Sequence, residues 1–160
     1  MQREMRRKDR LVENKAELIE IIEKCEICRI AMVDEDGAPY IVPMNFGYSW
    51  EEDNLILYFH GAKVGRKIDI LEKNKRVCIE MDCEHELVIN EDSAKSTYKY
   101  ASIIGDATVS FVEELAEKEI GLQKLMEHLT KRKGFSFTEA QLNGVFVFTA
   151  TVTELKGKRH

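Results

Sequence analysis

The segment Leu57-Tyr-Phe-His-Gly-Ala-Lys-Val-Gly-Arg-Lys67 decides the fold expected for this chain, because it ends a β-type apolar run and opens a helix. Its last eight positions hold one histidine, two glycines and three cations. Arg66 and Lys67 fall in the first helical turn, where the positive end of the helix dipole disfavours cations. Free N–H groups at a helix start, together with these cations, favour a phosphate ligand. An ordinary polar turn is the alternative that spacing leaves open.

The composition is that of a globular chain, with 44% apolar and 33% charged residues among 160. We expect one domain spanning 1–160, which is long enough for a hydrophobic core. No stretch approaches the roughly 20 apolar residues of a membrane span, and no apolar signal region follows the charged start, so we predict a cytoplasmic protein. The net charge of −5 argues against a nucleic-acid partner. The early cations predict a solvated tail rather than a binding arm: Arg3, Arg6, Arg7, Lys8 and Arg10.

Four cysteines and a histidine are candidate ligands of a metal ion: Cys25, Cys28, Cys78, Cys83 and His85. Cys25-x2-Cys28 has the spacing of half a zinc ribbon, but Cys78-x4-Cys83 departs from the usual two-residue gap. Cys78 also lies within an apolar run, as a small buried residue would. A redox pair is disfavoured because Cys25 and Cys28 stand between a helix end and a strand start. We predict no metal site, and a zinc-binding module stays an alternative.

The first third of the chain predicts one helix followed by strands. Asn14 with Glu17 is a capping signal, and apolar residues recur at helical spacing up to about Lys24. Ile27–Val33 is almost wholly apolar or small, which predicts a strand buried on both faces. Pro39–Trp50 predicts an edge or bulged strand, because three residues that weaken a regular ladder alternate in it: Pro43, Asn45 and Gly47.

The rest of the chain alternates further strands with two helices. The expected segments are strand Leu55–His60, helix Val64–Lys73, strand Arg76–Asp82, a loop over Cys83–Ser96 with a short strand Leu87–Ile89, strand Thr97–Val112, helix Glu113–Lys131 and strand Val145–Thr153. Gly105 inside its strand predicts a bulge or a close approach of another backbone. Hairpins with helices only between groups of strands predict an α+β protein, and about six antiparallel strands favour a small barrel.

Three ordered motifs resemble the pyridoxamine 5'-phosphate oxidase-like flavoproteins, and within them the nitroimidazole-resistance branch. They are Pro39-Tyr-Ile-Val-Pro-Met-Asn-Phe-Gly-Tyr48, the segment 57–67 and Tyr100-Ala-Ser-Ile-Ile-Gly105. The start Met5-Arg-Arg-Lys-Asp-Arg10 is also similar to that branch, so the resemblance covers almost the whole chain. It implies a six-stranded antiparallel split β-barrel of Greek-key topology with flanking helices. It also implies a homodimer that binds one FMN per subunit in a cleft at the interface.

The resemblance assigns FMN contacts by matching positions: Pro43, Met44, Asn45, Phe59, His60, Gly65, Arg66, Lys67, Ser102 and Ile103. Gly65–Lys67 matches the segment that grips the phosphate. The strand Pro43–Asn45 matches the one along the isoalloxazine ring, and the other positions match strand segments beside or under the flavin. His60 matches the position that the nitroimidazole-resistance branch keeps near the flavin face. One departure is Ala107, which stands where the family often has a second glycine.

These features predict an FMN-dependent oxidoreductase that passes electrons from a nicotinamide donor to a nitroaromatic or quinone type of acceptor. The flavin supplies the redox chemistry. His60 is the candidate catalytic residue, because an imidazole changes charge near neutral pH. A non-catalytic carrier or sensor of FMN or another flat ligand is the alternative. A true pyridoxamine 5'-phosphate oxidase needs a second phosphate site, and no second cation cluster stands in a motif position. A Walker loop is excluded by the glycine spacing.

Overall fold

The computed structural model describes residues 5–160, which form one antiparallel sheet and several helices. Eight strands belong to the sheet in this range: β1 (Leu11–Val12), β2 (Ile27–Val33), β3 (Pro39–Asn45), β4 (Gly47–Glu51), β5 (Asn54–Gly61), β6 (Arg76–Val88), β7 (Thr97–Val112) and β8 (Phe146–Arg159). Their order is β3-β2-β6-β7-β8-β5-β4, and β1 pairs with β8. The predicted α+β class and antiparallel split-barrel sheet are confirmed, with eight strands in place of about six.

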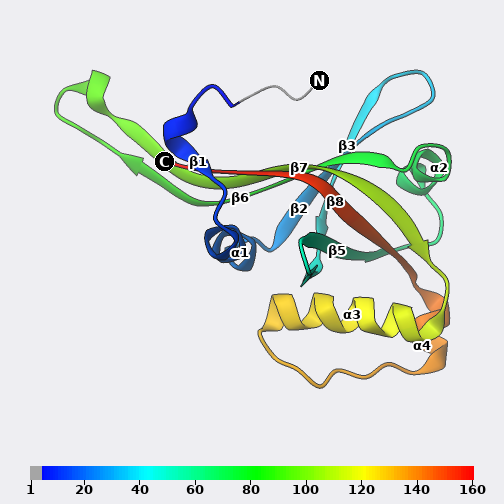
Figure 1. Ribbon diagram of the computed structural model, residues 1–160. Coiled ribbons are helices and arrows are strands. Elements are labelled where there is room, and N and C mark those ends of the chain that lie inside the picture. The colour runs from blue at the N-terminus through cyan, green and yellow to red at the C-terminus, as the bar shows by residue number, and fades with distance from the viewer. Residues whose placement is uncertain (1–4) are drawn as a thin grey trace.

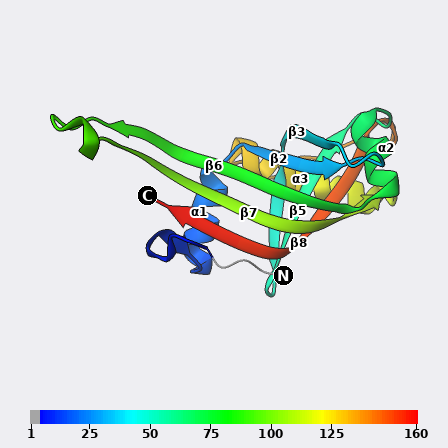
Figure 2. The same cartoon turned by 90° about the horizontal axis from the view of Figure 1, so that it is seen from above.

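The two edge strands of this sheet are consecutive in the chain. β3 ends at Asn45 on one edge and β4 begins at Gly47 on the other, so only Phe46 separates them. Consecutive Cα atoms are about 3.8 Å apart, so the sheet must curl until its edges approach. Figures 1 and 2 show this curl, with β3 and β5 brought toward each other. Because β3 and β4 share no ladder, the barrel stays split between them.

The hydrophobic core lies inside the curl and follows the two-residue period of the strands. On β7 every second residue from Ala101 to Val109 is buried, which confirms the predicted strand Thr97–Val112 with the same bounds. Phe59 of β5 and Phe148 of β8 stack inside the core with ring centroids 5.1 Å apart. A Cβ on Gly105 would lie 2.6 Å from the carbonyl oxygen of Glu154, so the predicted close approach is the backbone of β8.

Four α-helices flank the sheet: α1 (Lys15–Lys24), α2 (Arg66–Lys73), α3 (Leu115–Thr130) and α4 (Glu139–Gly144). Asn14 caps α1 as predicted, because its side chain accepts from the N–H groups of Ala16 and Glu17. In Figure 1, α3 lies along one side of the sheet, and α4 lies near the start of β8. α3 approaches β4 so closely that a Cβ on Gly47 would lie 2.3 Å from the backbone nitrogen of Leu125. Within residues 5–160, no helix is long and apolar enough to span a membrane.

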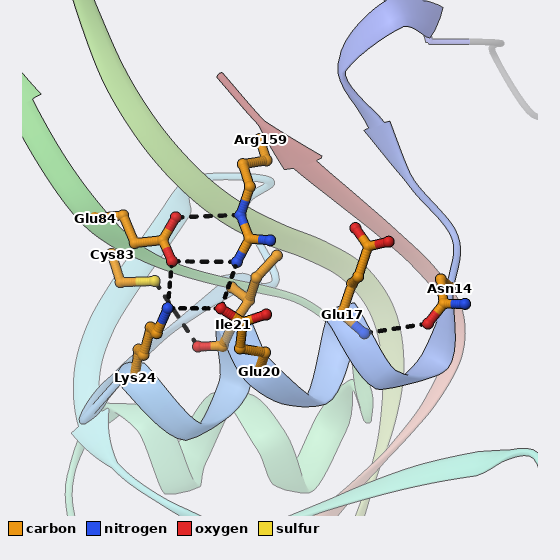
Figure 3. Close-up of polar contacts among 8 residues, drawn as sticks. All are labelled: Asn14, Glu17, Glu20, Ile21, Lys24, Cys83, Glu84 and Arg159. Carbon is orange, nitrogen blue, oxygen red and sulfur yellow. Dashed lines mark hydrogen bonds and ion pairs between the residues drawn. The ribbon is translucent and has the colours of Figure 1, made fainter.

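An ion-pair network fastens α1 to the ends of β6 and β8 (Figure 3). Arg159 donates to both carboxylate oxygens of Glu84 at 3.1 Å and to Glu20 at 3.3 Å. Lys24 contacts the same two acids, Glu20 at 2.7 Å and Glu84 at 2.6 Å. The charge of Arg159 is therefore balanced by two carboxylates on the helix side of β8.

The structure corrects the predicted burial of Ile27–Val33. Cys28, Ile30 and Met32 are buried, but Ile27 and Val33 are 38% and 48% exposed. The physical reason is that alternate residues of β2 face away from the core, where α2 approaches only the Val33 end of the strand. The strand is therefore buried on one face only.

The structure also moves several predicted boundaries. α2 begins at Arg66, so Val64 precedes the helix, and its side chain is 80% exposed instead of packing on the core. β6 runs to Val88 through most of the predicted loop, because a register shift with Glu84 at φ 60° absorbs the irregularity. This lengthens β6 and β7 into an arm that projects from the body in Figures 1 and 2. β8 is longer than predicted, and α4 was not foreseen.

The basic N-terminal stretch departs from the solvated tail expected for it. A 3-10 turn covers Lys8–Arg10, and β1 then pairs with the end of β8, with Leu11 opposite Lys158. Arg3 lies outside the described residues. This stretch is therefore part of the sheet's edge structure from about Lys8 onward.

Candidate cofactor site

The start of α2 has a backbone conformation that favours glycine. Gly65, which precedes the helix, has φ 135° and ψ 164°, a region that other residues rarely adopt. Its carbonyl oxygen accepts from the N–H groups of Ile68 and Asp69 at 2.8 and 3.2 Å. The N–H groups that begin a helix have no acceptor within it, and Gly65 has no side chain to cap them. The backbone here can therefore bind an anion.

Lys67 brings its ammonium group to the end of β5. A Cβ on Gly61 would lie 3.1 Å from Lys67 Nζ and 4.0 Å from Met44 Cε. Any larger residue at position 61 would therefore displace the Lys67 ammonium group from the β5 backbone. Met44 belongs to β3 and Gly61 to β5, so three elements meet where the barrel is split. The structure thus brings together two predicted cofactor contacts, Met44 and Lys67, from segments that are distant in sequence.

Arg66 points instead toward the turn between β2 and β3. Its Nη2 lies 3.3 Å from Asp34 Oδ2, and its guanidinium carbon lies 4.6 Å from the centre of the Tyr40 ring. Asp34 is itself held by the turn, because its Oδ1 accepts from the N–H of Ala38 at 2.8 Å. This bond, together with the guanidinium of Arg66, keeps the pKa of Asp34 below its usual range. A guanidinium has five N–H donors, so most of those on Arg66 are left for a ligand.

His60 is exposed and lies one residue before Gly61 in β5. Alternation along the strand places it on the face that Tyr58 uses against Gly121 of α3. Partial burial of the ring, and then the charge of Lys67, lower the pKa of His60 below its usual range. The imidazole is therefore neutral at pH 7 and can accept a proton or a hydrogen bond.

The structure does not bring every predicted contact to this place. Phe59 and Ile103 are core residues, 1% and 0% exposed, so their side chains are not available to a ligand within one subunit. Ser102 faces outward on β7 but lies far across the sheet from β3. The strand register joins Pro43, Arg29, Glu80 and Ile104 in one row over four strands. Three strand spacings separate the ends of this row by roughly 14 Å.

Apolar side chains remain uncovered on the outer face between these two groups. Exposed residues there are Ile27, Val33, Ile41 and Ile104, at 38%, 48%, 60% and 52% exposure. Pro43 and Asn45 are exposed on the same face at the β3 edge. The chain therefore carries two separate parts of the predicted site on one face, with the ion pair of Arg29 and Glu80 between them and exposed apolar side chains around it.

Sequence reasoning missed the two residues that hold Arg66. Asp34 lies in the acidic turn Asp34-Glu-Asp-Gly37 and Tyr40 lies in the motif 39–48, and neither position signals a contact with Arg66. No local signal connects either residue to α2, because the contacts cross about thirty positions of chain and depend on the packing of the turn. Their discovery required the tertiary structure.

The cysteines do not gather into a metal site. All four are free thiols, Cys25 and Cys28 buried and Cys78 and Cys83 half-buried. In residues 5–160, no group of three or more His, Cys, Asp or Glu side chains is placed to hold a metal ion. Cys83 instead lies 3.8 Å from the carbonyl oxygen of Ile21 in α1.

Comparison with known proteins identifies relatives of this arrangement. The family model described as pyridoxamine 5'-phosphate oxidase matches residues 14–159. A solved structure from Bacteroides thetaiotaomicron, of a protein provisionally assigned to 5-nitroimidazole antibiotic resistance, is 34% identical with a TM-score of 0.81. That match covers 93% of this chain and 86% of the other. None of the curated proteins matches this chain.

Two more distant structures share the fold. The FAD- and haem-binding protein of Mycobacterium smegmatis is 16% identical with a TM-score of 0.79, over 94% of this chain and 73% of that chain. A flavocytochrome of Azotobacter vinelandii is 17% identical with a TM-score of 0.77, over 98% and 72%. The family model matches most of this sequence, and the match with the Bacteroides relative covers nearly all of this chain. This chain therefore belongs to the pyridoxamine 5'-phosphate oxidase family and is similar to its nitroimidazole-resistance branch.

Proposed function

We propose that this protein is a cytoplasmic FMN-dependent oxidoreductase that passes electrons from a nicotinamide donor to a small nitroaromatic or quinone acceptor. The observation that carries the proposal is the start of α2, where the backbone of Gly65 is followed by two cations, Arg66 beside the β2–β3 turn and Lys67 at the end of β5. We call this group, with Gly61, the α2 site. The flavin supplies the redox chemistry when bound.

The α2 site fits a phosphate monoester well. Lys67 supplies a point charge, and Arg66 supplies a planar fork that Tyr40 and Asp34 already orient. Charge-assisted hydrogen bonds of this kind contribute about 1.5 to 3 kcal/mol each. Asp34 is an acid beside the expected phosphate, so it opposes binding while it orients Arg66.

The ring of the cofactor would lie along β3, against the backbone of Pro43–Asn45, with Met44 beside Lys67. His60 would place a neutral imidazole near this ring, because its lowered pKa disfavours the charged form at pH 7. In that form it accepts a hydrogen bond or a proton from the reactant. Its role is therefore to hold a proton at the imidazole during transfer, and it is our candidate catalytic residue.

A homodimer completes this proposal. Ser102 lies too far from β3 to join Pro43–Asn45 within one subunit, and the exposed apolar side chains around the Arg29–Glu80 ion pair would pack against a second copy. Burying Ile41 and Val33 in this way would also supply the second buried face that the sequence of β2 predicts. FAD is the flavin of the related FAD- and haem-binding protein of Mycobacterium smegmatis. FMN is our proposal for this chain.

The absorbance spectrum of the purified protein tests this function first. We expect a yellow protein whose flavin is released as FMN on denaturation and is bleached by NADH or NADPH without oxygen. Titration of flavin-free protein with FMN and with FAD then tests the choice of cofactor. A protein that stays colourless after addition of both flavins would contradict the proposal.

Steady-state assays separate an enzyme from a carrier. The flavin-loaded protein is mixed with NADH or NADPH and with several nitroaromatic and quinone acceptors. Turnover with at least one pair is expected. A protein that binds FMN tightly but turns over no pair would instead be a flavin carrier or sensor. Oxygen-dependent turnover of pyridoxamine 5'-phosphate would identify the remaining alternative.

A further inference from the structure

A second group of cations gathers where the beginning and end of the described chain meet on the sheet. It comprises Arg10, Thr97, Tyr100, Lys158 and His160, which we call the terminal cluster. β1 pairs with β8 so that Leu11 stands opposite Lys158. The N–H of His160 donates to the carbonyl oxygen of Tyr100 at 2.9 Å. These backbone pairings hold three distant segments side by side.

The cations of the terminal cluster contact neutral acceptors. Arg10 Nη2 lies 2.9 Å from His160 Nε2, and Thr97 Oγ1 lies 2.6 Å from the same nitrogen. Arginine only donates, so Nε2 must be the unprotonated nitrogen, and its single lone pair is shared. Lys158 Nζ lies 5.4 Å from the centre of the Tyr100 ring, and Lys158 and Arg10 lower the pKa of Tyr100. Two positive charges therefore lie beside a phenol and an imidazole.

The next residue along β8 shows the contrast. Arg159 points toward α1, where Glu84 and Glu20 balance its charge (Figure 3). Alternation along the strand turns Lys158 to the other face. Among residues 5–160, no carboxylate forms an ion pair with Arg10 or Lys158, since the neighbouring Asp9 is bound by Arg7 at 2.6 Å. Within the described residues, the charges of Arg10 and Lys158 are therefore not balanced by a direct ion pair, and Asp9 acts on Arg10 and His160 only at longer range.

We propose that the terminal cluster binds the phosphate group of the second, phosphate-bearing reactant of the flavin site. This inference rests on the proposed function for the identity of the reactant, but not for the binding of the anion itself. Arg10 supplies a planar guanidinium fork, Lys158 an ammonium, and Thr97 and Tyr100 hydroxyl groups, and this set of donors suits a tetrahedral anion with several oxygens. A bound phosphate would accept from Arg10 and Lys158 and relieve the shared acceptors.

The position of the terminal cluster links it to the proposed cofactor cleft. Lys158 stands directly opposite Ser102 in the β7–β8 ladder. Tyr100 is two residues from Ser102 and therefore on the same face. Ser102 is one of the residues that we assign to FMN, so an anion at the terminal cluster lies beside the cofactor. The reactant would bind with its phosphate here and its reactive part toward the flavin.

Calorimetric titration of FMN-loaded protein with inorganic pyrophosphate tests the anion site. We expect one pyrophosphate per subunit in addition to FMN. The double variant Arg10→Ala/Lys158→Ala should weaken pyrophosphate binding at least tenfold, about 1.4 kcal/mol, with FMN affinity changed less than twofold. The charge-preserving variant Arg10→Lys/Lys158→Arg should restore part of the binding. The control Lys73→Ala/Lys95→Ala removes the same charge from exposed residues paired elsewhere and should bind pyrophosphate normally.

Two comparisons separate this inference from the proposed function. Arg66→Ala/Lys67→Ala protein, in which FMN binding is impaired, should still bind pyrophosphate at the terminal cluster. Displacement of pyrophosphate by NADP⁺ would identify the electron donor as the ligand, and displacement by pyridoxal 5'-phosphate would identify a phosphorylated acceptor. Displacement by neither would overturn the assignment to a reactant. Absent pyrophosphate binding, or binding that survives in the folded Arg10→Ala/Lys158→Ala variant, would overturn the site.

Discussion

The α2 site and the terminal cluster are both cationic, but they are assembled in opposite ways. The cations of the α2 site are adjacent in sequence, and the turn acid Asp34 partly balances and orients one of them. The cations of the terminal cluster, Arg10 and Lys158, are separated by almost the whole chain. They lie beside the phenol of Tyr100 and the imidazole of His160. The α2 site is a local sequence motif that a tertiary contact with Asp34 helps to orient. The terminal cluster exists only because β1 pairs with β8.

This difference implies different behaviour toward anions. In the α2 site a ligand competes with an acid that is already present, which favours a ligand whose other contacts add affinity. In the terminal cluster no carboxylate of the described chain forms an ion pair with Arg10 or Lys158, and Asp9, which pairs with Arg7, acts on the cluster only at longer range, so a small anion alone should bind. We therefore expect the α2 site to select a whole cofactor, and the terminal cluster to accept a phosphate group with fewer other requirements.

The largest expected effect is at the α2 site. Replacing Arg66 and Lys67 together with alanine should lower FMN affinity at least tenfold, about 1.4 kcal/mol, because charge-assisted bonds to the phosphate are lost. Fluorescence titration of flavin-free protein measures it, and circular dichroism checks folding. The control Lys95→Ala/Lys99→Ala removes two cations from the β6–β7 arm. Unchanged FMN affinity in the Arg66/Lys67 variant would show that the cofactor phosphate binds elsewhere.

Gly65→Ala separates the backbone of the α2 site from its charges. A Cβ at this position meets nothing within 4 Å, so the cost is conformational, about 1 to 3 kcal/mol for a residue held at φ 135°. For a chain of this size the melting temperature should fall by roughly 3 to 9 °C. Gly144→Ala in α4 is the matched control, since its surroundings are equally open and its backbone is helical. Equal melting temperatures for the two variants would contradict the strained conformation.

Asp34→Asn makes the α2 site resemble the terminal cluster. The amide oxygen can still accept from the N–H of Ala38, so the turn is kept while the competing negative charge is removed. FMN affinity should rise by about two- to fivefold, within the range of exposed ion pairs. Asp36→Asn, two residues away in the same turn, controls for general charge. A fall in affinity would instead mean that Asp34 mainly positions Arg66.

The smallest expected effect is a pH dependence of anion binding at the terminal cluster. Partial burial, and then the charges of Arg10 and Arg7, lower the pKa of His160, with Asp9 opposing them and Lys158 adding to them. A bound anion offsets these cations and raises the pKa of His160. The complex then holds a proton more tightly, so by linkage the anion binds more tightly as pH falls.

Sulfate is the probe for this effect, because it stays fully ionised between pH 5.5 and 8. Its affinity for FMN-loaded protein should rise about two- to threefold as the pH falls from 8 to 5.5. His160→Gln should remove most of this slope while pyrophosphate still binds. A sulfate affinity that falls as pH is lowered would contradict the assigned tautomer of His160.

Local sequence patterns predicted the elements whose signals lie within a few residues. The cap at Asn14, the strand Thr97–Val112 and the glycine at position 105 all follow from neighbours in the chain, and the structure confirms them. The predicted element boundaries were wrong where pairing between strands outweighed the polar local sequence that predicted a loop. The polar residues after Cys83 extend β6 because β7 supplies a partner strand, which no local pattern records.

The sequence by itself determined the α2 site as a candidate, because a glycine and two cations at a strand-to-helix junction are chemistry visible in a few consecutive residues. Only the tertiary structure decided what surrounds it. The curl of the sheet brings Met44 to Lys67 and Asp34 to Arg66, and leaves Ser102 on another part of the face. The terminal cluster depends wholly on the tertiary structure, since the β1–β8 pairing that assembles it joins residues almost 150 positions apart.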